Sequence, residues 1–399
     1  MPPTIAHYDH PAHFEPLLPQ TYRSRLVEQA RPVVEASLKL QGALAPATRR
    51  ELVELVRAMN SYYSNRIEGQ STHPVHIEKA LHQNFSHTPD IAKRQRIAMA
   101  HIEAEKVLEA SPATESQRFS SQMLQTAHEA LYTRLDEADR TTEEGALVLP
   151  GAWRQKQVAV YRHEPPPPEA IAAFLQRADA VYVQPWGWDD LLIAAASAHH
   201  RLIWVHPFLD GNGRACRLQL HASLFRLTGG LWSANRGLAR QRDTYYLRLS
   251  EADMARQGAL DGRGNLSEKM LYEWCRFFIA VCQDQVSFMT SMLAPDTLKK
   301  RLTALLHLRA QERPESDYRR EAVLPMLHVL ATGPVSRGDF VQMTGLSPST
   351  ARKTVSRLLS DGLLQSDSHR GELRIGFPLD GLQVLFPDLY PEAATRPDF

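Results

Sequence analysis

The sequence predicts a mainly α-helical protein that carries one small β-hairpin and ends in a separate module of short helices. Apolar residues recur at intervals of three and four through most of the chain, which is the spacing of one face of a helix. Strand-like alternation with Pro and Gly interrupts this spacing around 146–168. After 318 the helical segments become shorter, and two strand-like pieces follow them.

The helical segments follow a proline-rich lead-in over residues 1–20, which we expect to be extended. A turn at Pro150-Gly151, alternation over 158–160 and four closing prolines predict the hairpin within 146–168. On either side of it, apolar positions fall on one helix face in segment after segment. The expected helices cover about 22–60, 74–83, 91–110, 116–134, 169–183, 189–204, 214–227, 240–257, 267–292 and 296–312.

The length of 399 residues predicts two or three domains. A net charge of +1 gives the whole chain no field that would attract nucleic acid or a membrane. Three cysteines are too few for a disulfide framework, and no segment approaches the roughly 18 apolar residues of a membrane span, so we expect a cytoplasmic protein without membrane contact. The expected parts are an N-terminal helical region (1–115), a core (116–292), a linker helix (293–317) and a C-terminal module (318–399).

The C-terminal module fits a winged helix-turn-helix. Gly345 lies in the tight turn, and Ser347-Pro348 is a typical helix start. The third helix carries hydroxyl and basic side chains suited to DNA, but six Arg or Lys against four Asp or Glu over 337–374 is a modest charge. DNA binding and protein contact therefore both stay open. The expected helices are 320–331, 337–343 and 348–359, and the strands are 363–364 and 373–375.

One segment of twelve residues gathers the side chains that phosphate chemistry needs. Its two glycines permit close approach of backbone N–H groups at the start of a helix, which makes an anion cradle. Its arginines suit phosphate oxygens, its aspartate suits Mg²⁺, and its histidine suits a general base. The combination predicts nucleotidyl or phosphoryl transfer. The residues are His206, Asp210, Gly211, Asn212, Gly213, Arg214 and Arg217.

The same segment resembles the signature of the Fic family, His-Pro-Phe-x-Asp-Gly-Asn-Gly-Arg-x-x-Arg, at every specified position. The resemblance implies a helical core that transfers AMP from ATP to a Ser, Thr or Tyr hydroxyl of a target protein or of the protein itself. It implies that His206 is the base and that Asp210 holds Mg²⁺. It places the ATP phosphates against Gly211, Asn212, Gly213, Arg214 and Arg217.

A second match lies upstream, where Ser64-Asn65-Arg66-Ile67-Glu68-Gly69 fits the family's inhibitory pattern. Read by itself, it is a helix end with Gly69 as terminator. A carboxylate there opposes the helix dipole and needs a cationic partner. The resemblance supplies Arg217 as that partner, which implies that Glu68, with Ser64 and Gly69, inhibits the same chain.

Two weaker matches concern the substrates. The hairpin resembles the family's flap, which implies that Val158 and Val160 contact the target segment along an exposed strand edge. The stretch around Tyr245 and Tyr246 resembles the segment near the adenine pocket, although two tyrosines on a helix also suit a core.

We therefore expect an autoinhibited protein adenylyltransferase that uses ATP and Mg²⁺. A homodimer would suit both the core and the C-terminal module. Two alternatives stay open: an enzyme that removes AMP, and a DNA-binding transcriptional regulator whose Fic domain senses a nucleotide.

Overall fold

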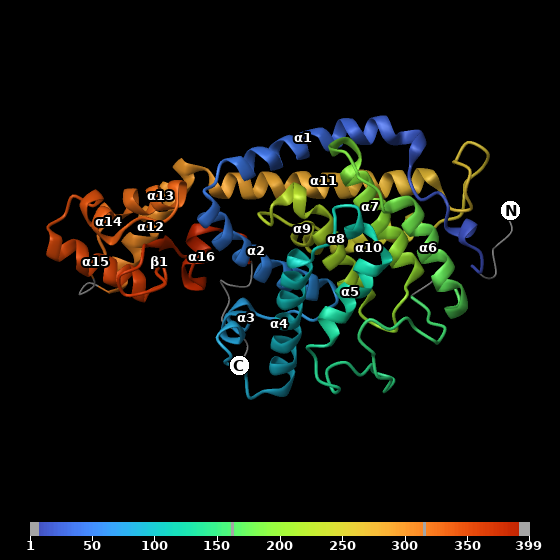
Figure 1. Cartoon of the computed structure of the whole chain (residues 1–399), viewed down its shortest axis with the longest axis horizontal. Helices are drawn as coiled ribbons and strands as arrows, with labels where there is room; N and C mark the ends of the chain where they lie inside the picture. Colours follow the sequence, from blue (N-terminus) through green and yellow to red (C-terminus); the bar gives the residue numbers. More distant parts are fainter. Residues whose placement is uncertain (1–7, 161–162, 314–316, 391–399) are drawn as a thin grey trace.

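The computed structural model describes residues 8–160, 163–313 and 317–390, and it is mainly α-helical. Figure 1 shows a large helical body joined to a smaller C-terminal group of elements. The body contains α1 (Arg23–Gly42), α2 (Pro46–Ile67), α3 (Pro74–Leu81), α4 (Pro89–Ala110), α5 (Ser121–Tyr132), α6 (Ile171–Tyr182), α7 (Trp188–Val205), α8 (Asn212–Thr228), α9 (Ala234–Arg240), α10 (Arg242–Ala252) and α11 (Glu268–Leu293).

The C-terminal group begins with α12 (Pro295–Glu312), which continues from the end of α11. The other elements of the group are α13 (Val323–Thr332), α14 (Arg337–Met343), α15 (Pro348–Ser360), β1 (Leu364–Gln365), β2 (Arg374–Ile375) and α16 (Leu379–Leu385). The two strands pair antiparallel, with Leu364 opposite Ile375. Helices and strands thus fall close to the expected positions, and α16 is an addition that the sequence did not predict. A winged helix-turn-helix function for this group stays a prediction.

Helix α8 lies at the centre of the helical body. It packs against α4, α5 and α7, and nearly all its residues are buried. A helix buried all round lacks a single apolar stripe, so polar residues such as Arg217 are enclosed with it. Gly211 precedes its first turn and Gly229 follows its last, with φ of 76° and 56°, because glycine takes left-handed backbone without strain.

The single helix expected over 22–60 is wrong, because the chain breaks before Pro46 into α1 and α2. Proline suits the first turn of a helix, but it disfavours helical backbone in the preceding residue, and Ala45 is extended. Helix α2 then runs beyond the expected end to Ile67. The lead-in is also not wholly extended, since 11–14 and 20–22 form 3-10 turns.

The expected hairpin is reduced to isolated bridges. Within the described part of 146–168, no regular strand is present. Val160 and His163 exchange two backbone hydrogen bonds of 2.9 Å, and Leu147 bridges to Thr141. The intervening residues 161 and 162 lie outside the described residues. The four prolines explain the short pairing, since a proline cannot donate a ladder hydrogen bond.

The C-terminal group packs back onto α2. The Thr48 hydroxyl donates to the carbonyl of Leu330 (2.7 Å), and the Tyr63 hydroxyl donates to the carbonyl of Leu389 (2.9 Å). Helix α16 also packs against α3, although the two are far apart in sequence. Elements after residue 318 therefore contact the helix that leads to Glu68.

Among the described residues, no single helix has the length and apolar composition to span a membrane. Helices α11 and α12 satisfy both criteria only as a pair, across a bend of 60°.

Candidate functional site

The loop between α7 and α8 has a backbone that few sequences can form. His206 ends α7 in the left-handed region (φ 49°, ψ 59°), and Gly211 takes φ 76° directly before α8. Asn212 closes the loop, because its side chain accepts from the N–H of Phe208 and donates to the Phe208 carbonyl, both at 2.9 Å. A Cβ on Gly211 would lie 2.4 Å from the hydroxyl oxygen of Tyr132. The motif residues are thus selected by the loop geometry as well as by chemistry.

We expect Gly211→Ala to lower the free energy of unfolding by about 1–3 kcal/mol more than Gly145→Ala does. Both glycines have positive φ, but no atom lies within 4 Å of a Cβ on Gly145. The control therefore carries only the backbone strain, and the difference measures the clash with Tyr132. Urea denaturation of both variants checks this, and equal losses would contradict the close packing.

Asp210 is the acidic group of the site, and it is half exposed. The Tyr132 hydroxyl donates to its Oδ2 atom at 2.8 Å, and an Arg214 nitrogen lies 3.5 Å from the same atom. Partial burial would raise the pKa of this carboxyl, but Arg214 and Tyr132 outweigh it and lower the pKa. The carboxylate therefore stays ionised with room beside it for a hard cation.

His206 lies at the end of α7, where the loop that carries Asp210 begins. Among the described residues, its Nδ1 atom is buried without a hydrogen-bond partner. Burial, with nearby His163 and Arg154, lowers the pKa of the imidazole to about 4. The ring is therefore neutral at pH 7, which is the form that accepts a proton.

Arg154 fixes the segment that the sequence assigned to the flap. Its Nε atom donates to the His206 carbonyl (2.8 Å), and its other nitrogens donate to the carbonyls of Lys156 (3.0 Å) and Pro166. Val158 and Val160 lie half-buried on this segment. One buried guanidinium thus joins both arms of the segment to the backbone of the candidate base.

Glu68 and Arg217, which are 149 positions apart, form an ion pair of 2.5 Å. The Arg217 guanidinium is buried and also donates to the hydroxyl (3.0 Å) and the carbonyl (3.1 Å) of Ser64. Burial alone would lower the pKa of Arg217, but the Glu68 carboxylate outweighs it and raises the pKa. A Cβ on Gly213 would lie 2.4 Å from Glu68 Oε1, so the carboxylate rests against the first turn of α8.

Helix α2 ends as its sequence predicts, and this end positions Glu68. Gly69 takes φ 76°, and its N–H donates to the Arg66 carbonyl at 3.0 Å. The N–H of Gln70 donates to the Asn65 carbonyl at 2.9 Å, which completes a Schellman turn. The Gln70 side chain then accepts from Arg214 (3.2 Å).

The two tyrosines assigned to an adenine pocket lie at this helix end. Tyr245 is buried, and its hydroxyl is 3.0 Å from His199 Nε2. The Tyr246 hydroxyl donates to the Ile67 carbonyl at 3.1 Å. The structure thus brings both close to Glu68 and Arg217, and their contact with a base stays a prediction.

Sequence reasoning missed four residues of the site. Tyr132 and His128 come from α5, where they read as ordinary helix positions. His128 Nε2 lies 3.1 Å from the Asp210 carbonyl, and its Nδ1 accepts from the N–H of Gly151. Arg154 and Gln70 gave no local signal either. Each acts through a contact with a distant segment, which spacing along the chain does not reveal.

Behind Arg217, one turn further along α8, lies a buried polar cluster. His221 Nε2 is 3.3 Å from Glu105 and 3.4 Å from Glu109. Spacing alone would allow these three side chains to hold a metal ion. However, Asn60 donates to Glu105 (2.6 Å) and Arg57 to Glu109, so α2 already supplies the compensating groups. The cluster therefore joins α2, α4 and α8, and half-exposed Asp210 is the better Mg²⁺ ligand.

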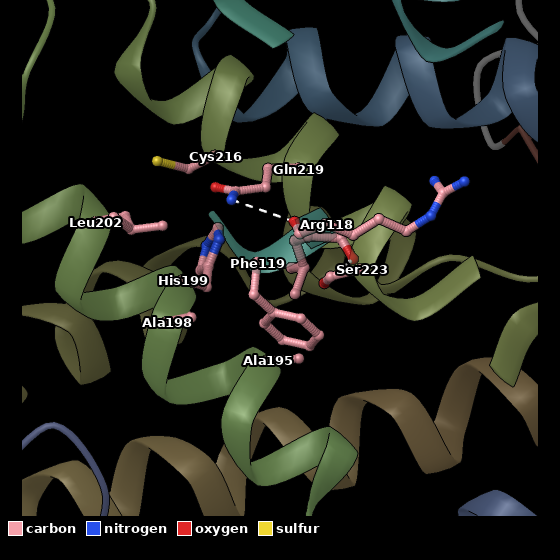
Figure 2. A pocket seen from close by; sticks show the side chains of 10 residues that line it. Arg118, Phe119, Ala195, Ala198, His199, Leu202, Cys216, Gln219 and Ser223 are labelled. Carbon is pink, nitrogen blue, oxygen red and sulfur yellow. Dashed lines mark hydrogen bonds between the residues drawn. The ribbon is translucent and has the colours of Figure 1, made fainter. Parts of the chain in front are cut away.

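A small cavity lies on the other side of α8, between α7 and the 3-10 turn Gln117–Phe119. Figure 2 shows His199 and Cys216 at one end and Gln219, which donates to the Arg118 carbonyl, beside them. Its volume is about 10 Å³, enough for one water molecule and far too little for a nucleotide.

Residues 118–225 match the Fic/DOC family, and this segment includes the whole loop from His206 to Arg217. The segment is a Fic domain. Its match runs from the 3-10 turn before α5 to the last part of α8, and it leaves out α2 with Glu68. The Fic domain therefore supplies the loop, Tyr132 and Arg217, whereas the carboxylate that pairs with Arg217 comes from outside it.

Curated relatives match over a short part of the chain. "Protein adenylyltransferase Fic" from Drosophila willistoni is 37% identical over 82 residues, which is 19% of this chain and 16% of that protein. The protein of the same name from Nematostella vectensis is 37% identical over 83 residues, 19% and 18% of the two chains. The match thus spans less than a fifth of each relative, and it shows distant homology to protein adenylyltransferases.

Two solved structures resemble the fold over much more of the chain. A Fic family protein from Desulfovibrio desulfuricans G20 covers 92% of this chain and 98% of its own, with 17% identity and a TM-score of 0.50. Fic-1 from C. elegans covers 68% and 73%, with 17% identity and a TM-score of 0.51. At this identity the likeness shows the mainly α-helical Fic fold alone.

Proposed function

We propose that the protein transfers AMP from ATP to a hydroxyl group of a protein, either a partner or itself, and that Glu68 inhibits this transfer. The observation that carries the proposal is the complete loop His206–Arg217 with its last arginine paired to Glu68. The match of the Fic domain to protein adenylyltransferases supports the reaction class.

The residues present fit ATP and Mg²⁺. Arg214 Nε is buried without a partner among the described residues, as is His206 Nδ1, so both have hydrogen-bonding capacity to spare. The first N–H groups of α8 also point at the loop, as at any helix start. Asp210 would hold Mg²⁺, and Arg214 and Arg217 would hold the phosphates. Mg²⁺, when bound, supplies charge neutralisation on the phosphate oxygens.

In this proposal the neutral imidazole of His206 accepts the proton of the target hydroxyl. The hydroxyl oxygen forms a bond to the α-phosphorus, and the bond from that phosphorus to the leaving oxygen breaks, so that pyrophosphate departs. Arg214 and the helix start stabilise the charge that develops. The segment held by Arg154 lies beside His206 and orients the target chain.

Inhibition in this proposal is electrostatic and steric. Glu68 takes the guanidinium that the terminal phosphate of ATP needs, and its Oε1 rests against Gly213. An ATP molecule would have to replace a carboxylate that already satisfies a buried cation. Since a buried guanidinium is costly without an anion, each state keeps one partner for Arg217.

Label transfer from two forms of ATP tests the reaction class. With Mg²⁺ and a host lysate, label on the α-phosphate should stay on protein, and label on the γ-phosphate should not. The Glu68→Gly variant is the enzyme to use, since it removes the competing carboxylate. Retention of the γ-label instead would mean phosphoryl transfer. If no variant left either label on protein, both AMP transfer and phosphoryl transfer would be contradicted.

The lowered pKa of His206 predicts an unusual pH profile. A base with a pKa of about 4 is roughly 90% neutral at pH 5, whereas one at the ordinary 6.5 is only about 3% neutral. We therefore expect kcat/KM for ATP in Glu68→Gly to stay nearly constant from pH 8 to pH 5 and to fall below that. A loss of half of kcat/KM near pH 6.5 would show that burial does not lower the pKa of His206.

DNA contact by the C-terminal group is a second candidate function. Arg352 and Lys353 are exposed on α15, the expected recognition helix, although Arg357 is engaged with Asp361 at 3.0 Å. A gel shift with DNA from the region upstream of the gene that encodes this protein tests DNA binding. Binding that Arg352→Ala and Lys353→Ala both weaken would support it, and binding that neither changes would not.

A further inference from the structure

A cavity of about 410 Å³ lies between α2, α3 and the C-terminal group. Its volume is in the range that holds small organic ligands. The cavity lies away from the end of α2 that carries Glu68, since Leu55 and Ala58 line it whereas Ser64 and Glu68 lie at the helix end. Neither the Fic domain nor the proposed AMP transfer uses it.

The walls of this cavity combine apolar surface with negative charge. Its apolar lining includes Leu55 of α2, Ile77 of α3, and Phe377 and Leu382 of the C-terminal group. Three carboxylates, those of Glu51, Glu54 and Glu78, also line it together with His82, and no lysine or arginine is among the lining residues.

These carboxylates are not equally compensated. Arg374 lies 3.4 Å from Glu51, and Arg57 lies 2.6 Å from Glu54. Among the described residues, no arginine or lysine lies within ion-pair distance of Glu78, which is half-buried. Burial raises the pKa of Glu78, although a hydrogen bond from the backbone of Leu379 and the nearby His82 oppose this. A cation in the cavity would give Glu78 a partner with a permanent charge.

We propose that this cavity binds an organic cation with an apolar body, and that the bound cation favours the arrangement in which Glu68 pairs with Arg217. The cationic end would lie at Glu78, and the apolar part would lie between Leu55 and Leu382. The second half of the proposal rests on the proposed inhibition by Glu68.

The connection to Glu68 runs through two aromatic residues. Tyr390 lines the cavity, and its ring packs edge-on against Tyr62 of α2, with centroids 5.4 Å apart. The Tyr62 hydroxyl accepts from Arg66 at 3.0 Å, in the last turn before Glu68. A ligand that contacts both α2 and the C-terminal group binds the state in which the two are packed together. Its binding therefore increases the fraction of molecules in that state.

Fluorescence titration with dansylcadaverine tests the site. This probe joins an apolar naphthalene ring to a primary ammonium group, and dansylamide is the matched probe without the ammonium. We expect saturable binding of dansylcadaverine, at least about tenfold tighter than dansylamide, because the ammonium gains a charge-assisted hydrogen bond.

Three variants make this test specific. Glu78→Gln should remove most of the tenfold preference while it keeps the shape of the cavity. Ala58→Phe should weaken both probes by filling the cavity, and Glu28→Gln, on the exposed face of α1, should change neither. Equal affinities for the two probes, or full affinity in both Glu78→Gln and Ala58→Phe, would overturn the site.

Hydrogen exchange tests the connection without any measurement of activity. Saturating dansylcadaverine should slow amide exchange of residues 62–70 severalfold in the full chain, and dansylamide at the same concentration should have less effect. Binding with unchanged exchange in 62–70 would overturn the effect on Glu68. A failure of AMP transfer would leave both measurements intact, so the two proposals fail separately.

Discussion

Glu68→Gly is expected to raise the rate of AMP transfer at limiting ATP by about 10- to 100-fold. The change removes a charge-assisted hydrogen bond to a buried guanidinium, and such bonds contribute about 1.5–3 kcal/mol. That free energy no longer opposes the binding of the terminal phosphate. Initial rates with ATP labelled on the α-phosphate, measured well below KM, give the ratio directly.

Two controls separate charge from shape in this experiment. Glu68→Gln keeps the size of the side chain and removes its charge, so its rate should fall between those of the wild type and Glu68→Gly. Glu28→Gln removes a carboxylate from exposed surface and should leave the rate unchanged. Equal rates for the wild type and Glu68→Gly would refute inhibition by Glu68.

The same substitution should also change how ATP affects stability. Without Glu68, Arg217 keeps its hydrogen bonds to Ser64 but has no carboxylate partner among the described residues. An anion at that place then becomes more favourable. ATP should therefore raise the melting temperature of Glu68→Gly more than that of the wild type.

His206→Asn is expected to lower AMP transfer by about 10²- to 10⁴-fold, the range that a general base contributes. Asparagine is chosen because it tolerates the left-handed backbone of this position, whereas its amide does not accept a proton at neutral pH. Both proteins, with and without His206→Asn, also carry Glu68→Gly, so that inhibition by Glu68 affects neither rate. The rate of α-label transfer at saturating ATP is the measurement.

His206→Ala serves as the second variant. Alanine in left-handed backbone is strained, so this variant should lose stability that His206→Asn keeps, while both lose transfer equally. ATP-dependent stabilisation should persist in both, because Arg214 and Arg217 are untouched. Transfer that survives in His206→Asn at more than a tenth of the parent rate would show that another group takes the proton.

The sequence predicts local features of this protein well. Helix α8 begins at Asn212, two residues before the expected start, beside the consecutive Gly211, Asn212 and Gly213, and the end of α2 follows from Gly69. These signals act between neighbours, where backbone preference dominates. Helices α14 and α15 are placed within a residue for the same reason, since each begins with a serine that caps it.

Most of the features that were missed or wrong depend on distant contacts, whereas the break at Pro46 is local. Helical spacing continued through Pro46, so the break between α1 and α2 was hidden in an uninterrupted apolar pattern. The segment expected as a flap is held by the Arg154 side chain and one short bridge between Val160 and His163, and α16 forms against α12. Tyr132 meets Asp210 only because α5 packs on α8. Neither composition nor periodicity predicts such contacts between residues far apart in the sequence.

The order of Glu68 and Arg217 along the chain has a consequence for biosynthesis. The two residues are 149 positions apart, and translation at about 5–20 residues per second separates them by roughly 7 to 30 seconds. Helix α2 is therefore synthesised before the loop from His206 to Arg217. By the time Arg217 can fold into α8, the carboxylate that pairs with it is already present on the same nascent chain. Under the proposed inhibition, each molecule would then pass from synthesis to the folded state without an interval of unrestrained AMP transfer.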